Sequence, residues 1–290
     1  MNAASMENSG FEFSATYRNR DHAFKYDISA NLSTLKNKVT SLGIGKDSYI
    51  SGAYATYVGQ EIGQFYGWVY EGIARTQADL DGHATQQGVN VGDCLYKDIS
   101  GPEGTPDGVI DAYDQTVLGS GLPKVNFGLS THMEYKGFDL NISTYGVLNY
   151  HVSDDIYNSL NSCYGYGNKE VGMLDANRWS EDGTYLSSVP RTYAANNATL
   201  AWNDLFSSRK IQNAAYWKIA NVELGYNFPD KWFGGYVSGV RLYVSAQNLY
   251  TFTGYHGYNV DYAGGTFTPG YNFCSFPSAR TFMAGLHFTF

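Results

Sequence analysis

Apolar and polar residues alternate strictly along several stretches of this 290-residue chain. In residues 280–290, phenylalanine and other apolar side chains occupy every second position, and small or polar side chains occupy most of the others. The same alternation occurs in residues 11–18, 24–33, 125–136, 138–146, 220–228 and 240–247. Because side chains of a β-strand point alternately to its two faces, each stretch predicts a strand with one apolar and one polar face.

The connections between these stretches alternate in length. Breaks at 19–23, 137 and 229–239 are short, whereas those at 38–124, 151–213 and 253–280 are long. This succession is typical of outer-membrane β-barrels, in which short turns lie on the periplasmic side and long loops lie outside the cell. The aromatic stretch 62–73 alternates poorly, and a membrane-spanning strand there would break the succession. We therefore expect residues 62–73 to pack within an outer loop.

The charged residues of the predicted strands favour a barrel with a polar interior. Glu134, Lys136, Glu223 and Arg241 all fall on the polar face. We predict an all-β fold in which about seven strands form an arc of a large antiparallel transmembrane β-barrel with long extracellular loops. Two alternatives share the alternation: a soluble carbohydrate-binding β-sandwich, and a small stand-alone porin-like barrel. The porin-like barrel is disfavoured, since bacterial single-chain barrels use even numbers of strands.

Composition narrows the functional class. Tyrosine (26), phenylalanine (16) and glycine (33) are abundant, and only 16% of residues are charged. The formal net charge of −8 argues against nucleic-acid binding, which needs a basic face. Cys94, Cys163 and Cys274 have no metal-site spacing, and we expect isolated thiols. The first residues carry neither a basic nor an apolar segment, so we predict no signal peptide and expect an upstream part of the protein to be missing.

Two sets of residues are candidates for binding, and the sequence contains no recognisable catalytic constellation, so we predict that the protein is not an enzyme. Carboxylates could supply oxygen ligands to structural Ca²⁺, or could instead accept hydrogen bonds from nearby backbone N–H groups; they are Asp98, Asp107, Asp111 and Asp114. Aromatic side chains in the long loops could contact a ligand, or could simply pack those loops; they are Tyr164, Tyr166, Trp179, Trp202, Tyr258 and Tyr262.

Six motifs give the chain a family resemblance. It resembles the C-terminal third of the SusC/RagA-type TonB-linked outer-membrane transporters, and the motifs occur in the family's order. They are Gly10-Phe-Glu12, Gly59-Gln-Glu-Ile-Gly-Gln-Phe-Tyr-Gly67, Asp107-Gly-Val-Ile-Asp111, Gly121-Leu-Pro-Lys-Val-Asn-Phe-Gly128, Leu242-Tyr-Val-Ser-Ala-Gln-Asn-Leu-Tyr-Thr-Phe-Thr253, and Pro277-Ser-Ala-Arg-Thr-Phe282 continuing to Phe290.

The resemblance implies that residues 1–290 are the C-terminal barrel portion of a TonB-dependent receptor, with the plug domain and signal peptide absent. It implies a location in the Gram-negative outer membrane and import of oligosaccharides or peptides. The implied partners are a surface lipoprotein lid of the SusD type, TonB through the missing N-terminal part, membrane lipid, and the barrel-assembly machinery, for which Phe290 would be the assembly signal.

The acidic loop departs from the family pattern. Members usually carry a compact Asp-x-Asn-Gly-Asp-Gly stretch that resembles a calcium loop, whereas residues 98–108 of this chain contain additional residues. The calcium prediction rests on the four aspartates alone.

Overall fold

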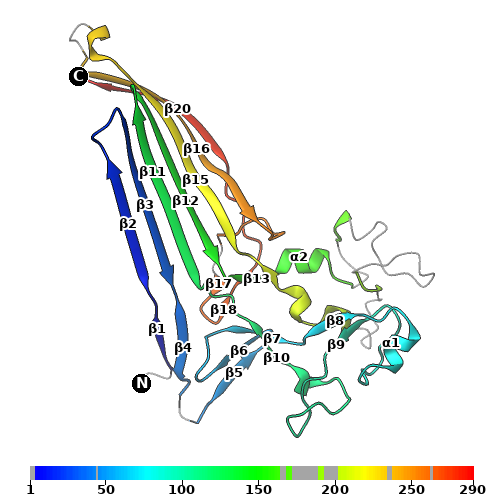
Figure 1. Cartoon of the computed structure of the whole chain (residues 1–290). Coiled ribbons are helices and arrows are strands. Elements are labelled where there is room, and N and C mark those ends of the chain that lie inside the picture. Colours follow the sequence, from blue (N-terminus) through cyan, green and yellow to red (C-terminus); the bar gives the residue numbers. More distant parts are fainter. Residues whose placement is uncertain are drawn as a thin grey trace.

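Seven long strands form one antiparallel sheet. In this computed structural model, residues 4–43, 45–163, 168–171, 189–192, 202–233, 237–261 and 264–290 are described. The strands follow one another in chain order across the sheet (Figure 1). They are β2 (Glu12–Asn19), β3 (Phe24–Thr34), β11 (Val125–Tyr135), β12 (Phe138–Leu148), β15 (Tyr216–Phe228), β16 (Gly239–Thr253) and β20 (Thr281–Thr289). All seven correspond to predicted stretches.

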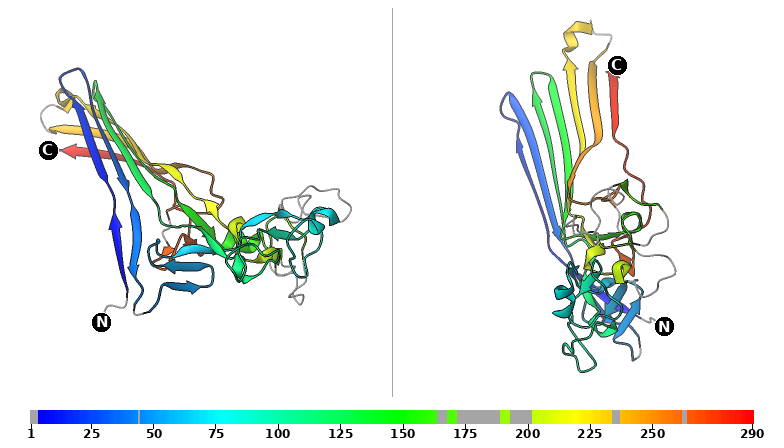
Figure 2. Two further views of the ribbon diagram at one scale, coloured as in Figure 1. Left: turned by 60° about the horizontal axis from the view of Figure 1, so that its bottom comes forward. Right: turned by 90° about the vertical axis from the view of Figure 1, so that its right-hand side faces the viewer.

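The two ends of the sheet differ, as the loop lengths predicted. Figure 2 shows the short connections together at one end, beside the C-terminus, and the long connections gathered at the other end. The connection between β11 and β12 is a two-residue turn, in which Lys136 and Gly137 both have positive φ (50° and 88°). Such a turn matches the twist of paired strands. Lys136, expected on the polar face of a strand, is therefore the first residue of the turn.

One face of the sheet is apolar from edge to edge. The pairing register aligns Leu140, Leu224 and Val244 in one row, and it pairs Leu242 with Leu286 in the next. The side chains of this face are open: Leu224 is 45% exposed and Phe282 is 70% exposed. A contiguous exposed apolar surface indicates contact with lipid or with another protein.

Aromatic side chains border this apolar face at both ends of the strands. At the turn end, the Phe138 and Tyr226 rings lie 4.6 Å apart, and Tyr226 contacts Phe228. At the loop end, Trp217 and Phe252 stack at 5.1 Å. The nine residue steps from Trp217 to Tyr226, at about 3.3 Å each and a tilt of about 40°, span roughly 23 Å. This height matches the apolar band of about 25 Å found between the aromatic girdles of transmembrane barrels.

The opposite face carries hydrogen-bonded charged groups. Arg241 on β16 donates to Asp139 on β12 (2.9 Å) and to Glu223 on β15 (2.7 Å), and Asn227 also donates to Asp139 (2.9 Å). Gly225 lies under this cluster, where a Cβ atom would approach the Arg241 guanidinium to 2.5 Å. Charged residues thus lie on the face opposite the exposed apolar one, as the alternation predicted.

Strands β15 and β16 continue past two β-bulges, at which the predicted strands ended. Relative to β12, β15 contains one extra residue at Ala220. Relative to β15, β16 contains one extra residue near Asn248, which has a φ of 51°. The bulge at Ala220 shifts the alternation of β15 by one residue, whereas in β16 residues 248 and 249 together interrupt the alternation without shifting it. The predicted strands 220–228 and 240–247 stopped where the period breaks, whereas the real strands continue to Tyr216 and Thr253.

The remaining elements are short and lie mostly at the loop end. Strands β1 (Ser5–Ser9) and β4 (Lys36–Ser41) continue the first hairpin, and the prediction missed both. The others are β5 (Ser48–Ser51), β6 (Tyr54–Tyr57), β7 (Gln64–Gly67), β8 (Tyr70–Ile73), β9 (Cys94–Tyr96), β10 (Thr116–Gly119), β13 (His151–Asp154), β14 (Gln212–Asn213), β17 (Gly264–Gly265), β18 (Thr268–Pro269), β19 (Tyr271–Asn272), α1 (Gln77–Asp81), α2 (Asp155–Leu160), and the 3₁₀ helices η1 (Ala112–Asp114), η3 (Ser208–Lys210) and η4 (Asp230–Phe233).

Residues 62–73 lie outside the seven-stranded sheet, as expected. They contribute β7 to a four-stranded sheet and β8 to a two-stranded sheet. Among the described residues, no helix is long and apolar enough to cross a membrane.

The exposed apolar face generates a test by charge insertion. Placing arginine at Leu224 or Leu242 should reduce the free energy of unfolding from a bilayer by about 2–4 kcal/mol if the position lies near the bilayer midplane. Asn221→Arg, on the polar face of β15, is the matched control and should cost far less. Equal losses on the two faces, measured by reversible unfolding from vesicles, would contradict the lipid-facing assignment.

Candidate functional site

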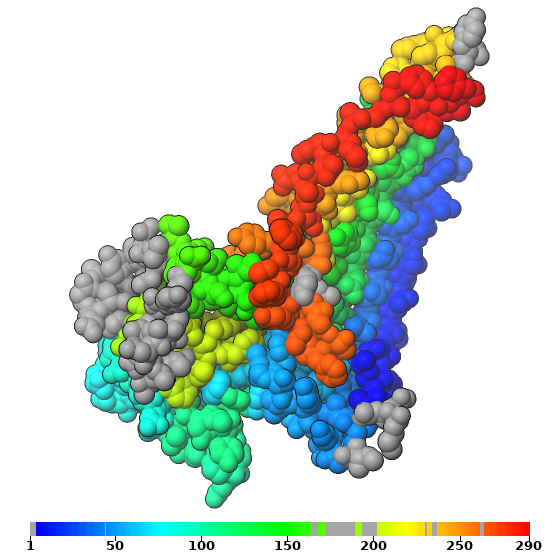
Figure 3. All heavy atoms as spheres, turned by 180° about the vertical axis from the view of Figure 1, so that it is seen from behind, coloured from blue at the N-terminus to red at the C-terminus, as the bar shows by residue number. Residues whose placement is uncertain are grey.

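The long connections fold together into one body at the loop end of the sheet, which we call the outer body. It comprises the described parts of residues 35–124, 149–215 and 254–280. Figure 3 shows this body as a broad mass beside the narrow blade of strands. Among the described residues, two buried clusters combine residues from different connections, and the first also includes Tyr216 at the start of β15. One contains Tyr150, Val152, Ala214, Tyr216, Tyr255 and Val260; the other contains Cys94, Tyr96 and Ile110, with Trp68, Tyr70 and Trp202 packed against it.

A buried carboxylate joins the first long connection to the second. Asp93 is 1% exposed and accepts two hydrogen bonds from Arg191, at 2.6 and 2.8 Å. Asn203 donates to the same carboxylate (2.8 Å), and its own side-chain oxygen accepts from the backbone N–H of Cys94 (2.7 Å). Because removing one partner would leave a buried charge unpaired, this network holds the two connections in one arrangement.

A second buried carboxylate joins the second connection to the third. Asp154 accepts from the backbone N–H of Tyr157 (2.8 Å), from the Asn272 amide (3.0 Å) and from the Tyr255 hydroxyl. Burial, with the hydrogen bond to Asp154, raises the pKa of Tyr255, so that this phenol remains a donor at neutral pH. The outer body is therefore stabilised by buried polar groups that come from far-separated parts of the chain.

The predicted ligand-contact aromatics have different surroundings. Trp202 donates its indole N–H to the Gln87 carbonyl (2.8 Å) and packs against Tyr96 and Trp68, so most of its contacts serve packing within the outer body. Tyr258 is 64% exposed and is open to a ligand. Tyr164, Tyr166, Trp179 and Tyr262 lie outside the described residues. The contact roles of all six stay predictions.

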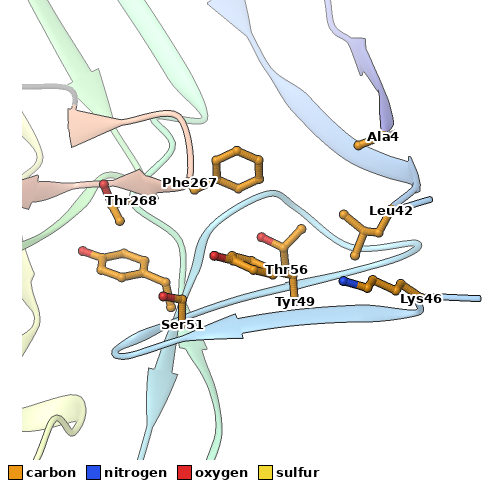
Figure 4. A pocket seen from close by; sticks show the side chains of 9 residues that line it. Ala4, Leu42, Lys46, Tyr49, Ser51, Thr56, Phe267 and Thr268 are labelled. Carbon is orange, nitrogen blue, oxygen red and sulfur yellow. The ribbon is translucent and has the colours of Figure 1, made fainter. Parts of the chain in front are cut away.

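An apolar pocket of about 510 Å³ lies in the outer body and includes residues that sequence reasoning missed. Figure 4 shows Tyr49 and Phe267 among the rings of its lining, with Lys46 extending from one side. The two rings are in edge contact at 6.0 Å. Hydroxyl groups of Ser51, Thr56 and Thr268 also line this pocket. Apolar walls with a few polar groups, at this volume, are typical of small-molecule sites. Both rings were visible in the sequence, but nothing there indicated that positions 49 and 267 meet.

The four candidate calcium ligands all accept hydrogen bonds from backbone N–H groups. Asp114 is fully buried and accepts from Ile99 (2.7 Å), from Ser100 and from Asp111. The carboxylate of Asp98 accepts from Gly108, that of Asp107 from Val109, and that of Asp111 from Tyr113. These contacts are those of the acidic-turn alternative. Throughout the described residues, no group of three or more acidic, histidine or cysteine side chains is arranged to share a metal ion.

Together, the fold and the surfaces define a class of protein. An open antiparallel sheet has an exposed apolar face between two aromatic borders, a polar opposite face, short turns at one end and large loops at the other. This is the wall of a large transmembrane β-barrel.

Comparison with known proteins gives the family. The chain is 30% identical over its whole length to TonB-dependent receptor P3 of Formosa agariphila, and 26% identical to TonB-dependent receptor SusC of Bacteroides thetaiotaomicron. A solved structure of the RagAB peptide transporter matches 98% of the chain with a TM-score of 0.77 and 21% identity. No family model matches the sequence.

The sequence similarities place the chain among the TonB-dependent receptors of the Gram-negative outer membrane, SusC included, as the motifs indicated. The RagAB structure shows the same fold. The chain spans 29% of the P3 receptor and 27% of SusC. It therefore corresponds to a part of those receptors, and the sheet is an arc rather than a closed barrel.

The calcium prediction is tested by thermal unfolding of a full-length receptor that carries this chain. If the acidic loop binds Ca²⁺, the added ion should raise the unfolding midpoint with its occupancy, because it binds the folded state alone. Replacing Asp107 and Asp111 by alanine should remove that rise. Asp114→Ala serves as a contrast: it should destabilise the protein by about 3 kcal/mol with or without Ca²⁺, because buried N–H groups lose their acceptor. If Ca²⁺ does not change the thermal unfolding midpoint of the unmodified protein, the acidic-turn interpretation holds.

Proposed function

We propose that the chain supplies barrel wall and extracellular ligand-contacting loops to an importer of oligomeric nutrients, and that TonB delivers the energy for import. The observation that carries this proposal is the similarity of the whole chain to TonB-dependent receptors. The polar inner face and the organised outer body support it, since an importer needs both a hydrophilic passage and a surface that captures ligand.

The proposed mechanism is binding without chemical turnover. Capture needs aromatic faces and hydrogen-bonding groups at the loop end, and Tyr258, Tyr49 and Phe267 supply exposed aromatic faces there. Aromatic side chains bury large apolar area with little loss of conformational freedom. The nutrient is proposed to be an oligosaccharide or a peptide; the solved RagAB structure is that of a peptide transporter.

The proposed partners follow from the family. A surface lipoprotein of the SusD type would cover the loop end, TonB would act through the part of the receptor that precedes this chain, and the barrel-assembly machinery would insert the protein. The two alternatives fit less well. A β-sandwich would cover the apolar face, which is open in the described residues. A stand-alone barrel would pair β2 with β20, and these strands form the two separate edges of the sheet.

Uptake should depend on TonB and on the second long connection. A full-length receptor carrying this chain should import an oligomeric nutrient unchanged in cells with TonB, and should fail in cells without it. Deleting residues 160–205 should weaken capture while leaving the barrel assembled. Replacing residues 172–188 by a Gly/Ser segment of equal length is the sharper variant, because it keeps the Arg191 and Asn203 partners of Asp93.

The matched control replaces the exposed residues 102–106 with Gly/Ser of equal length. Ligand affinity should fall for the 172–188 variant and stay unchanged for the control. If the 172–188 variant and the deletion both bind ligand as tightly as the unmodified receptor, the binding surface lies on other loops or on the preceding part of the protein.

Phe290 is proposed to form part of the assembly signal. It follows β20 directly and is 90% exposed, so its removal breaks no packing. Deleting Phe290 from the full-length receptor should reduce the amount in the outer membrane, measured by immunoblotting of membrane fractions. Phe276→Ala is the control, since Phe276 is equally exposed but lies outside the terminal strand. Unchanged levels after deletion of Phe290 would contradict this role.

A further inference from the structure

A second pocket in the outer body contains a cation that has no partner among the described residues. The pocket has a volume of about 300 Å³, and Arg209 and Lys210 of η3 line it together with Tyr70 of β8 and Tyr157 of α2. Within the described part of the chain, no hydrogen bond or ion pair engages the Arg209 guanidinium. Arg209 is nevertheless only partly exposed. A partly buried charge without a partner is costly, and such a charge is unusual unless it has a role.

None of the described residues that line the pocket carries a carboxylate to balance the Arg209 charge. The titratable groups that act most strongly on it are the thiols of Cys163 and Cys94 and the phenols of Tyr70 and Tyr96. Burial raises the pKa of Cys163 to about 11 and that of Cys94 to about 12, and it also raises the pKa of both phenols. All four groups are therefore neutral at physiological pH.

The nearby acids have other partners. Asp204 accepts from the backbone N–H of Cys163 (3.0 Å), and its backbone carbonyl accepts from the Lys210 ammonium. Exposed Glu170 accepts from the Asn161 amide (3.0 Å). The Asp204 carboxylate also acts on Lys210, raising its pKa against the larger lowering effect of burial. Arg209 is the cation of this pocket that remains available to an anion.

The turn that carries Arg209 is fixed in position before any ligand binds. The Ser208 backbone N–H donates to the Trp68 carbonyl (3.0 Å), and the Ser208 hydroxyl accepts from the Tyr70 N–H (3.0 Å). Asn158 of α2 donates to the Lys210 carbonyl (3.3 Å). A preorganised donor loses little freedom on binding, and the planar guanidinium fork matches the two oxygens of a carboxylate or sulfate.

We propose that this pocket is a subsite for an anionic group on a sugar unit of the imported ligand, with Arg209 as the residue that binds the anion. The proposal rests on the proposed import function and narrows its ligand to acidic glycans. A carboxylate of a uronic acid and a sulfate ester present the same oxygen chemistry, and the experiment separates them.

The lining of the pocket favours a glycan over a peptide. Asn158 and Asn161 donate hydrogen bonds through their side-chain nitrogens. Within the described residues, no group donates a hydrogen bond to their side-chain oxygens. These oxygens can therefore accept hydrogen bonds from sugar hydroxyls. A peptide recognised through its main chain would need a free strand edge. Next to this pocket the β8 edge is already occupied by Ser208. The volume, near the lower end of the range for small-molecule sites, suits one sugar ring rather than an oligomer.

The experiment measures thermal stabilisation and affinity of a full-length receptor carrying this chain, in detergent and without TonB. The probes are galacturonate, a sulfated galactose, galactose, and a tripeptide of glutamate. Either or both of the anionic sugars should raise the unfolding midpoint, and galactose should not. Arg209→Gln should abolish the shift and lower the affinity for an oligomer of the effective sugar by about ten- to hundredfold. Arg209→Lys should retain only part of the affinity, because lysine keeps the positive charge but its ammonium lacks the planar fork of the guanidinium.

Arg280→Gln is the matched control, because Arg280 is exposed, lies in the third long connection and does not line the pocket, so its loss should leave anion binding unchanged. The proposal is overturned if no anionic sugar stabilises the receptor, if galactose stabilises it equally, or if Arg209→Gln binds as the unmodified protein does. Stabilisation by the tripeptide alone, lost in Arg209→Gln, would assign the pocket to acidic peptides instead. Anion binding is measured without TonB, so a failure of TonB-dependent uptake would not change the outcome of the binding experiment. Conversely, a failure of anion binding would not contradict the proposed import function.

Discussion

The structure depends on the hydrogen bonding of the backbone within the lipid. In a bilayer, each backbone N–H or C=O group without a hydrogen-bond partner costs several kcal/mol. A strand therefore crosses the bilayer only when it is hydrogen-bonded to a neighbouring strand on both sides. The continuous ladder from β2 to β20 meets this condition for its five inner strands. The two outer strands meet it only when further strands of the receptor close the barrel. The alternating side chains follow from the same ladder, since pairing fixes which residues face the lipid.

Within the sheet, the sequence carried almost all the information needed. Lipid and a polar interior select opposite residue types at every second position, and strands of eight residues or more display that period clearly. The prediction failed where the period itself is broken. Ile219 and Trp217 lie beyond the bulge at Ala220, so their parity changes, and the predicted strand ended at Ala220. Strands β1 and β4 were missed because they are short and lie beyond the break at Gly10, where a Cβ atom would lie 1.9 Å from the Thr34 carbonyl oxygen.

The outer body could not be predicted in the same way. Its strands of two to four residues are too short to show a period, and its stability comes from contacts between distant positions, such as Asp93 with Arg191 and Asp154 with Asn272. The sequence did indicate that residues 62–73 lie outside the sheet, because loop parity constrains them. It gave no reason to select Arg209, whose significance depends on its having no acidic partner among the described residues. The adjacent basic residues Arg209 and Lys210, within a connection rich in tyrosine, were the one available signal.

The paired bulges at Ala220 and Asn248 make this part of the barrel wall sensitive to the insertion or deletion of a single residue, because such a change alters which side chains face the lipid. Because one extra residue in β15 is followed by one extra residue in β16, Trp217 and Phe252 emerge on the same side and stack there. Loss of a residue at either bulge would turn every side chain between it and the loop end to the other face. During evolution, the outer loops can therefore change length one residue at a time, whereas these two strands can gain or lose a residue only together.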